Sequence, residues 1–239
     1  MDISQNSSNC MYNLILTKFN ENIGRDNFFS YDLQYPYFFN IKNDYFYITQ
    51  SILDNINSTI KLDIDTFTNE LRKEEQDYNS IAPKNNLPKK RYKAITTFSV
   101  TFNKNHILSV IVNLIGMIEG EEPLYNYLYN YNYDLLTGNE IPIKNVFNSN
   151  INYIEVITNY VNYKVNQNPS MYYQDVEIVV PADQAFYLTE DGVVIYFGID
   201  EIAPSQFGIA KFKMQFSKFS PYINPRFYCS TAGKGARLI

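Results

Sequence analysis

The chain has 239 residues, 45% of them hydrophobic and 19% charged, which fits one large or two small globular domains and excludes a disordered protein. Its formal net charge is −5 and no basic cluster exceeds Lys89-Lys90-Arg91, so neither a nucleic acid nor an anionic membrane surface is an expected partner. The 22 tyrosines and 17 phenylalanines are a heavy aromatic load, part of which we attribute to a low-GC genome.

Cysteine and histidine are too scarce for a zinc site. Cys10 and Cys229 lie near opposite ends, and His106 is the one histidine, so we expect no metal and no other cofactor. We expect two unrelated thiols, with a Cys10–Cys229 disulfide as the alternative if the protein is exported. The sequence shows no signal peptide and no apolar run near the ~18 residues that a membrane span needs. We therefore expect a cytoplasmic or spore-associated protein, or an extracellular one if a leader has been removed.

The first part of the chain predicts two extended segments and one long helix. Weak alternation over residues 11–19 predicts a strand, and 22–25 predict a turn. The aromatic segment 28–40, interrupted by Pro36, is expected to be extended. Isoleucines at every fourth position from Ile48 to Ile64 predict an amphipathic helix over 44–77, capped by Asn43 or Asp44.

The next part predicts an antiparallel meander. Residues 79–90 contain two prolines and predict a loop at the boundary between two subdomains. Phe98, Val100 and Phe102 alternate with polar residues and predict a strand, and 107–115, apolar on both faces, predict a central strand.

A row of tyrosines dominates the stretch that follows. Because they occupy every second position, a strand places them all on one face, whereas a helix would scatter them. This row either belongs to the sheet core, with hydroxyls at its margin, or faces a partner. We take its members as candidate ligand-binding residues: Tyr125, Tyr127, Tyr129, Tyr131 and Tyr133.

The C-terminal part predicts a second amphipathic helix over 151–165 and a short strand over 176–180. Asp191-Gly192 lies between two apolar runs and predicts a β-hairpin. The loop 200–208 is either a structural corner or a rigid rim that presents Gln206 and Phe207, our remaining candidate ligand-binding residues. Residues 210–216 predict a closing strand.

No catalytic constellation stands out. The sequence contains no GxSxG, HExxH or P-loop pattern, and His106 is expected in an exposed turn. Glycoside hydrolysis needs only two carboxylates, so the acidic residues of two loops form a remote alternative site. They are Glu119, Glu121, Glu122, Asp200 and Glu201.

Two motifs resemble a known family. Residues 131–147, YNYDLLTGNEIPIKNVF, and residues 185–214, AFYLTEDGVVIYFGIDEIAPSQFGIAKFKM, are similar to the C-terminal domain of the anti-sigma factor RsiV. The same domain occurs in the non-catalytic part of PdaC-type peptidoglycan deacetylases. The resemblance covers roughly 92–219, and residues 11–90 resemble, more weakly, the domain that usually precedes it.

The resemblance implies an α+β binding module and no enzyme. In the anti-sigma factor the domain lies outside the cell and binds lysozyme. Family members often carry a Gly-Gly-Ala-His loop before the tyrosine strand, whereas residues 116–123 of this chain lack the histidine. The chain shows no membrane anchor, sigma-binding segment or deacetylase domain, so we expect neither anti-sigma signalling nor deacetylation.

We therefore expect an α+β fold in which an antiparallel meander sheet is packed by two main amphipathic helices, in two closely associated subdomains. Residues 8–90 form the first, 91–229 the second, and 230–239 a tail. The expected function is non-enzymatic recognition of a lysozyme-like protein or a cell-wall glycan in a spore-forming, low-GC bacterium such as a member of the Clostridia. A self-associating spore or surface-layer protein is the alternative, and a carboxylate-dependent glycosidase the remote one.

Overall fold

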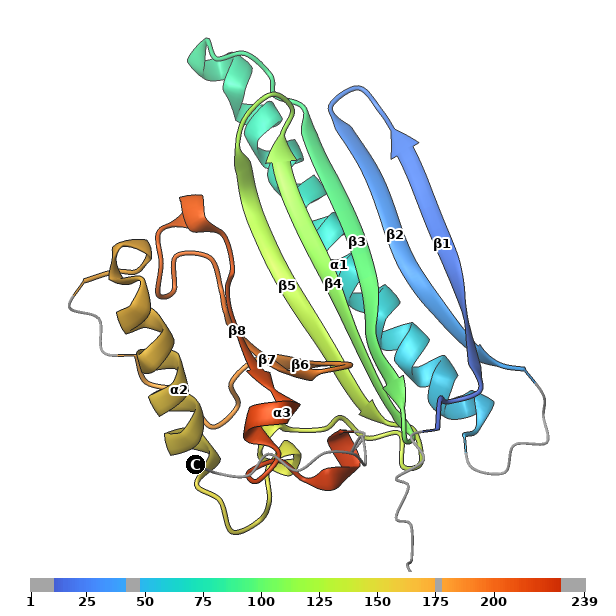
Figure 1. Ribbon diagram of the computed structural model, residues 1–239. Coiled ribbons are helices and arrows are strands. Elements are labelled where there is room, and N and C mark those ends of the chain that lie inside the picture. The colour runs from blue at the N-terminus through green and yellow to red at the C-terminus, as the bar shows by residue number, and fades with distance from the viewer. Residues whose placement is uncertain (1–10, 42–47, 175–177, 229–239) are drawn as a thin grey trace, which may run out of the picture.

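The predicted α+β class is confirmed in a computed structural model, which describes residues 11–41, 48–174 and 178–228. A five-stranded sheet has the order β1-β2-β3-β4-β5, and a separate three-stranded sheet has the order β6-β7-β8. The long helix α1 (Gln50–Ile81) covers one face of the larger sheet, and the smaller sheet with α2 (Tyr153–Gln167) lies at its other face (Figure 1). Cys10, Cys229 and the tail 230–239 lie outside the described residues.

The larger sheet contains the predicted meander and one parallel junction. Its strands are β1 (Ile15–Arg25), β2 (Phe29–Asn40), β3 (Tyr92–Lys104), β4 (Ile107–Ile118) and β5 (Pro123–Asp134). Strands β3, β4 and β5 pair antiparallel, and β4 is central, as predicted. Strand β2 pairs parallel with β3, because α1 carries the chain between them. The sheet is therefore mixed, and the expected division at residue 90 falls between α1 and a strand that pairs with β2.

The first hairpin differs from the prediction. The predicted turn over 22–25 is wrong, because these residues belong to β1 and pair with β2. The chain reverses at Asp26, whose Oδ1 accepts hydrogen bonds from the backbone N–H groups of Phe28 (3.0 Å) and Phe29 (2.9 Å). Pro36 lies in β2 beyond the last pair with β3, Leu33 with Thr96, so its missing N–H interrupts no bond between those strands.

The isoleucine ladder forms α1, as predicted, but the helix ends at Ile81 rather than at 77. Its N-cap is Thr49, whose side chain accepts from the backbone N–H of Ile52, whereas Asn43 and Asp44 lie outside the described residues. The short 3₁₀ helix η1 (Ala82–Asn85) follows, so much of the predicted loop over 79–90 is helical.

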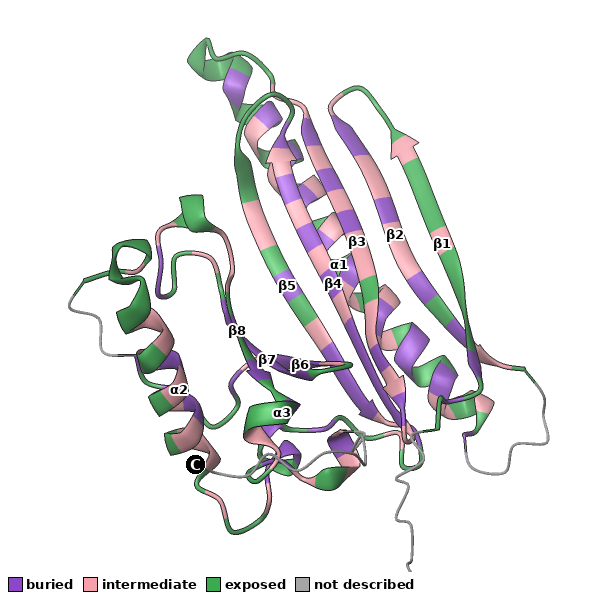
Figure 2. Ribbon diagram, in the orientation of Figure 1, coloured by how far each residue is buried: buried purple, intermediate pink, exposed green. Residues whose placement is uncertain are grey.

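A β-bulge divides the core between the two faces of the larger sheet. The register shifts between Val100 and Phe102 of β3. Val100 packs against the core under α1, whereas Phe102 joins the core of the smaller sheet. An extra residue reverses the alternation of side chains, so the bulge gives one strand apolar residues on both faces. Figure 2 shows β4 largely buried and the edge strand β1 largely exposed.

The smaller sheet consists of β6 (Phe186–Thr189), β7 (Gly192–Phe197) and β8 (Ala210–Gln215). The predicted hairpin and closing strand are thus confirmed, although they form a sheet of their own. The predicted second helix is α2, capped by Asn152. Residues 178–180 are not a strand, so this part of the predicted strand 176–180 is wrong, and residues 176 and 177 lie outside the described residues. The short helix α3 (Phe216–Phe219) follows β8.

Candidate functional site

The tyrosine row lies on the α1 side of β5, and the C-terminal part of the row is buried. Tyr131 and Tyr133 are 4% and 6% exposed and belong to the core under α1. The Tyr131 hydroxyl donates to Asp63 Oδ2 (2.8 Å), and the Tyr133 hydroxyl donates to Glu140 Oε1 (3.2 Å). Burial, with the nearby carboxylates, raises the pKa of Tyr133 to about 12 and raises the pKa of Tyr131 further. Both phenols are therefore neutral donors that fasten β5 to its surroundings.

The N-terminal part of the tyrosine row is more exposed and lies on the edge strand β5. Tyr127 and Tyr129 are 45% and 40% exposed, and the rings of Tyr125 and Tyr127 stack with centroids 5.9 Å apart. The Tyr125 hydroxyl donates to Glu74 Oε2 (2.9 Å), and Glu70 is exposed beside them. We name Tyr125, Tyr127, Tyr129, Glu70 and Glu74 the tyrosine edge.

The tyrosine edge is hollowed and acidic. A shallow pocket of about 190 Å³ lies between α1 and β5, with Phe67 and Leu71 at its apolar base. The pKa of Tyr129 is raised by burial and then by the charges of Asp63 and Glu70, and the pKa of Tyr125 is raised first by its hydrogen bond to Glu74. Exposed aromatic rings beside carboxylates suit a partner that brings apolar and positively charged groups.

Gln206 and Phe207 lie elsewhere. They belong to the short 3₁₀ helix η4 (Ser205–Phe207) in the β7–β8 connection, and both are exposed. Ile209, two residues later, packs against a core cluster that includes Leu128, on the face of β5 opposite to the tyrosines. No contact found in the described residues joins Gln206 or Phe207 to the tyrosine row.

The rest of the β7–β8 connection is a packed corner. Ile202 and Ala203 are buried, the Tyr173 backbone N–H donates to the Ile202 carbonyl (3.0 Å), and Gly208 has a φ of +72°. These features fit the structural interpretation of this loop.

Four of the five acidic residues of the remote alternative have separate partners, and the fifth, Glu122, is exposed. Glu119 and Glu121 pair with Arg91 and Lys90 at the β4–β5 turn. The Asp200 and Glu201 carboxylates accept from the Tyr173 hydroxyl (3.1 Å) and the Gly198 backbone N–H (2.6 Å) in the β7–β8 connection. Figure 1 shows these two connections apart, at the end of the larger sheet and on the smaller unit. His106 lies in the β3–β4 turn with a φ of 59°.

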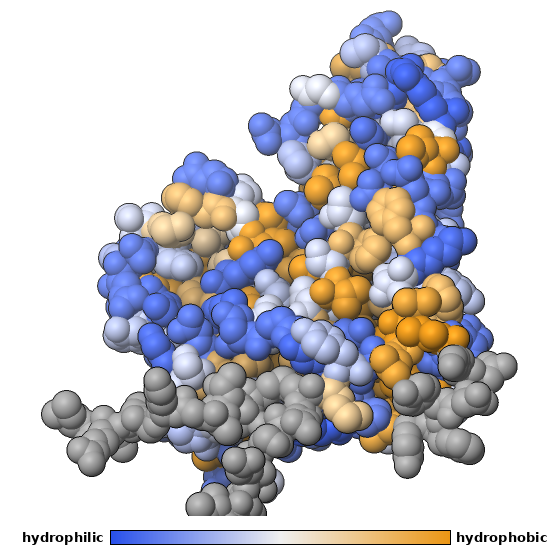
Figure 3. Space-filling model, turned by 45° about the vertical axis from the view of Figure 1, so that its right-hand side comes forward, coloured by the Kyte–Doolittle hydropathy of each residue, from blue (hydrophilic) through white to orange (hydrophobic). Residues whose placement is uncertain are grey.

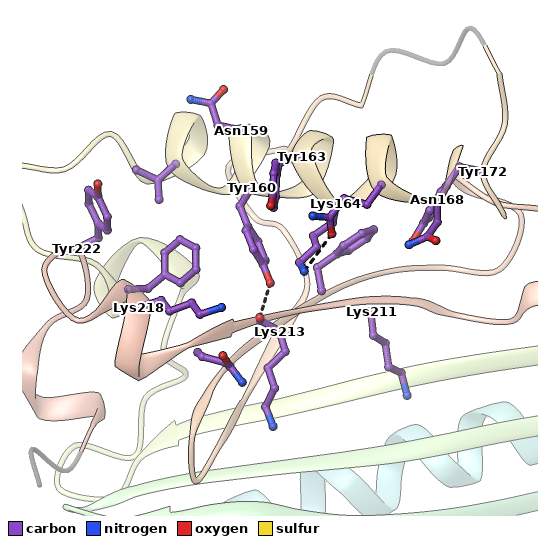
Figure 4. Close-up of a pocket in the computed structure, with 15 residues that line it drawn as sticks. Asn159, Tyr160, Tyr163, Lys164, Asn168, Tyr172, Lys211, Lys213, Lys218 and Tyr222 are labelled. Carbon is purple, nitrogen blue, oxygen red and sulfur yellow. Dashed lines mark hydrogen bonds between the residues drawn. The ribbon is translucent and has the colours of Figure 1, made fainter. Parts of the chain in front are cut away.

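A second surface lies between α2, β8 and α3. It is an open groove of about 880 Å³ lined by fifteen residues (Figure 4). The Tyr160 hydroxyl crosses from α2 to the backbone carbonyl of Lys213 in β8 (2.5 Å), and the Tyr160 ring meets Phe219 edge-on at 4.9 Å. Tyr172 stacks on Phe212 at 6.0 Å and forms part of the wall. We name this surface the lysine groove.

The lining of the lysine groove contains four lysines and no acidic residue, although the whole chain has a net charge of −5. Lys164 extends from α2 and Lys218 from α3 toward the space between the walls, whereas the side chains of Lys211 and Lys213 point away from α2 (Figure 4). Lys213 pairs with Asp191 at 2.5 Å. Sequence reasoning missed this surface, because about fifty residues separate Lys164 from Lys211 and Lys218.

The edge strand β1 exposes apolar side chains, Leu16 on one face of the sheet and Phe19 and Ile23 on the other. Leu16, Phe19 and Ile23 of β1 are 44%, 55% and 65% exposed. Figure 3, which brings the β1 side forward, shows hydrophobic patches among hydrophilic residues on this face. Exposed edge strands of this kind are templates for association.

In the part of the chain that the structure describes, no helix has the length and apolar character needed to cross a membrane. The same residues contain no group of three or more His, Cys, Asp or Glu side chains arranged to hold a metal ion.

Comparisons with known proteins give matches in two consecutive segments. Residues 24–115, from the end of β1 into β4, match the family described as deacetylase PdaC. Residues 144–217, which include α2 and the smaller sheet, match the family described as a protein of unknown function, DUF3298. A search of the curated proteins found no match.

Solved structures share the fold. A DUF3298 family member from Bacteroides fragilis NCTC 9343 superposes with a TM-score of 0.63 at 14% identity, covering 92% of this chain and 96% of the other. A DUF3298 family protein from Pseudomonas aeruginosa PAO1 gives a TM-score of 0.55 at 11% identity, with coverage of 90% and 96%. At these identities the likeness shows the fold alone. The chain therefore matches the PdaC and DUF3298 domain families in consecutive segments and has the fold of solved DUF3298 proteins.

Proposed function

We propose that this chain is a non-enzymatic binding module that recognises a protein or a cell-wall glycan. The resemblance of its two motifs to the RsiV C-terminal domain names lysozyme as the first protein to test. The observation that carries the proposal is the tyrosine edge, where two large aromatic side chains, Tyr127 and Tyr129, remain 45% and 40% exposed. Such rings are enriched at protein interfaces, because they bury much area with few rotatable bonds.

The charge beside these rings supports a protein partner over a glycan at this surface. Glu70 is exposed, and Glu74 accepts the Tyr125 hydroxyl, so the rings lie next to two carboxylates on α1. A protein that presents lysine or arginine beside apolar groups would place its cations over the tyrosine faces and near these acids. The base of the pocket, Phe67 and Leu71, would receive an apolar side chain.

Calorimetric titration with lysozyme and with purified peptidoglycan fragments tests the proposal. Saturable binding to at least one of the two ligands is expected. If neither ligand binds saturably, the proposal is refuted. Lysozyme binding should weaken at least tenfold in Glu70→Lys, because a like charge then faces the partner's cations. The matched control is Asp183→Lys, which makes the same change of charge at an exposed position outside the tyrosine edge. Equal weakening in both variants would remove the tyrosine edge as the site.

Self-association is a second candidate function, favoured by the exposed apolar side chains of the edge strand β1. Pairing of two β1 edges would satisfy the free backbone groups of both strands and place Leu16, Phe19 and Ile23 beside side chains of the partner strand. Analytical ultracentrifugation over a wide concentration range tests this candidate. A concentration-dependent dimer that is lost in Phe19→Lys would support it, and a strict monomer at high concentration would exclude it.

A further inference from the structure

From the lysine groove we infer a second binding site, separate from the tyrosine edge, whose ligand is an anionic glycan, a saccharide that carries carboxylate or phosphate groups. The inference gives the glycan branch of the proposed function a site and a chemistry. It concerns a different surface from that expected for a protein partner, so either can fail alone.

The positive charge of the lysine groove supports an anionic ligand. None of the fifteen lining residues is acidic, and Lys164 and Lys218 extend toward the same space from two different helices. Neither makes an ion pair in the described part of the chain: Lys164 donates to the amide oxygen of Gln167 at 3.4 Å, and Lys218 has no ion pair there. Two cations held near one space in an acidic protein attract an anion to that space.

The other lining residues suit a sugar. Tyr163, on the exposed surface of α2, is 60% exposed, and its ring offers a flat apolar face to a pyranose. Asn159, Asn168 and Gln215 are exposed, and no hydrogen bond of their side-chain amides is found in the described residues. Amides both donate and accept, which matches the hydroxyl groups of a saccharide. A volume of about 880 Å³ lies within the range of ligand pockets and has room for several sugar units.

The edge of β8 argues against an acidic peptide as the ligand. The backbone N–H of Phe216 donates to the Asp191 carbonyl (2.8 Å). Every second residue of an antiparallel strand directs its backbone groups toward its neighbour, so those of Lys211, Lys213 and Gln215 point away from β7. A peptide could pair with that edge as an added strand. The Tyr160 hydroxyl, however, already occupies the Lys213 carbonyl at 2.5 Å and bridges the groove at its middle. A glycan needs no such ladder and can lie beside Tyr160.

Calorimetric titration of the whole chain tests the site with four probes. Oligogalacturonate carries carboxylates, dextran phosphate carries phosphates, maltohexaose is an uncharged saccharide, and poly-glutamate is an acidic peptide. We expect saturable binding to one or both anionic glycans, weakened by added salt, and much weaker binding to maltohexaose. The two anionic arms identify which charged group the groove prefers.

The double variant Lys164→Gln/Lys218→Gln should weaken that binding roughly tenfold, because two charge-assisted contacts are lost. The matched control is Lys18→Gln/Lys84→Gln, which removes the same charge at exposed positions outside the groove and should change affinity less than twofold. Tyr163→Ala should weaken binding without any change of charge. Thermal unfolding measures whether each variant is folded.

Three results would overturn the inference. The first is that neither anionic glycan binds saturably. Another is equal weakening by the two lysine double variants, which would indicate general charge attraction. The third is tighter binding of poly-glutamate with the same variant sensitivity, which would assign the groove to an acidic peptide. Lysozyme binding should be unchanged in Lys164→Gln/Lys218→Gln, so a failure here is distinguishable from a failure at the tyrosine edge.

Discussion

The side-chain amide of Asn132 donates a hydrogen bond to the backbone carbonyl of Phe186 over 2.8 Å, and this bond joins the larger sheet to the smaller one. The Asn132 Oδ1 accepts from the Ser109 hydroxyl (2.6 Å), whose oxygen accepts from the backbone N–H of Leu188 (3.0 Å). Asn132 is 3% exposed and Ser109 is fully buried. Matched polar pairs therefore fix where the two sheets meet, because a buried group without a partner costs free energy.

We predict that Asn132→Ala lowers the free energy of unfolding by about 2–4 kcal/mol. The Phe186 carbonyl and the Ser109 hydroxyl would each lose a hydrogen-bond partner at the buried contact between the two sheets. Urea unfolding followed by circular dichroism measures the change. Asn126→Ala is the control, because Asn126 lies on the same face of β5 and its side chain makes no hydrogen bond found in the described residues. A similar loss of unfolding free energy in both variants would contradict the stabilising role of the hydrogen bonds between the two sheets.

A glycine in the predicted hairpin is required by close packing. A Cβ atom at Gly192 would lie 2.6 Å from the backbone oxygen of Met214 on the neighbouring strand. Backbone cannot rotate away as a side chain can, so Gly192→Ala should destabilise the protein by about 1–3 kcal/mol. Gly198→Ala is the control, because its nearest neighbour is the Glu201 carboxylate at 3.4 Å. Thermal unfolding should separate the two variants by several degrees, and equal midpoints would show that β8 can shift to make room.

Features encoded by neighbouring residues could be predicted from the sequence. The Asp191-Gly192 turn, the isoleucine ladder of α1 and the alternation of β5 each depend on residues a few positions apart. The prediction failed where a distant strand decides the outcome. Residues 22–25 look like a turn, but they remain extended because β2 pairs with them.

The candidate site shows the same limit. Periodicity predicted that the tyrosines share one face, yet only the course of α1 decides that Tyr131 is buried while Tyr129 is exposed. The lysine groove joins α2 to β8 and α3, and no local pattern relates Lys164 to Lys218. The change of face at Phe102 depends on a bulge that the alternation of Phe98, Val100 and Phe102 does not reveal.

An ion pair at the end of β5 should make stability depend on acid pH. Burial opposes ionisation of Asp134, but the hydrogen bond from Arg226 (2.7 Å), the backbone N–H of Leu136 and the charge of Arg226 together hold its pKa below the ordinary value. The unfolded chain thus takes up this proton at a higher pH than the folded chain. The stabilisation is complete above the ordinary pKa of about 4 and is lost as the pH falls through the lowered folded value.

We therefore expect Asp134→Asn to be less stable than the wild type by roughly 1 kcal/mol at pH 7, a modest value because solvent screens the partly exposed Arg226. The difference should shrink as the pH falls below about 4. Urea unfolding at a series of pH values measures it. Asp77→Asn, at an exposed position without an ion pair among the described residues, should show no comparable difference. A gap of constant size from pH 7 to pH 3 would contradict the assignment.

The two halves of the tyrosine row should separate binding from stability. Tyr129→Ala removes a ring that is 40% exposed, so it should weaken lysozyme binding at least tenfold and change the free energy of unfolding by about 1 kcal/mol or less. Tyr131→Phe keeps the buried ring but leaves the Asp63 carboxylate without its donor, so it should lower stability by about 1–3 kcal/mol and leave the affinity unchanged. Calorimetric titration and urea unfolding of both variants provide the two readouts. If Tyr131→Phe weakened binding as much as Tyr129→Ala did, the row would act as one structural unit, and its exposed rings would not be the contact surface.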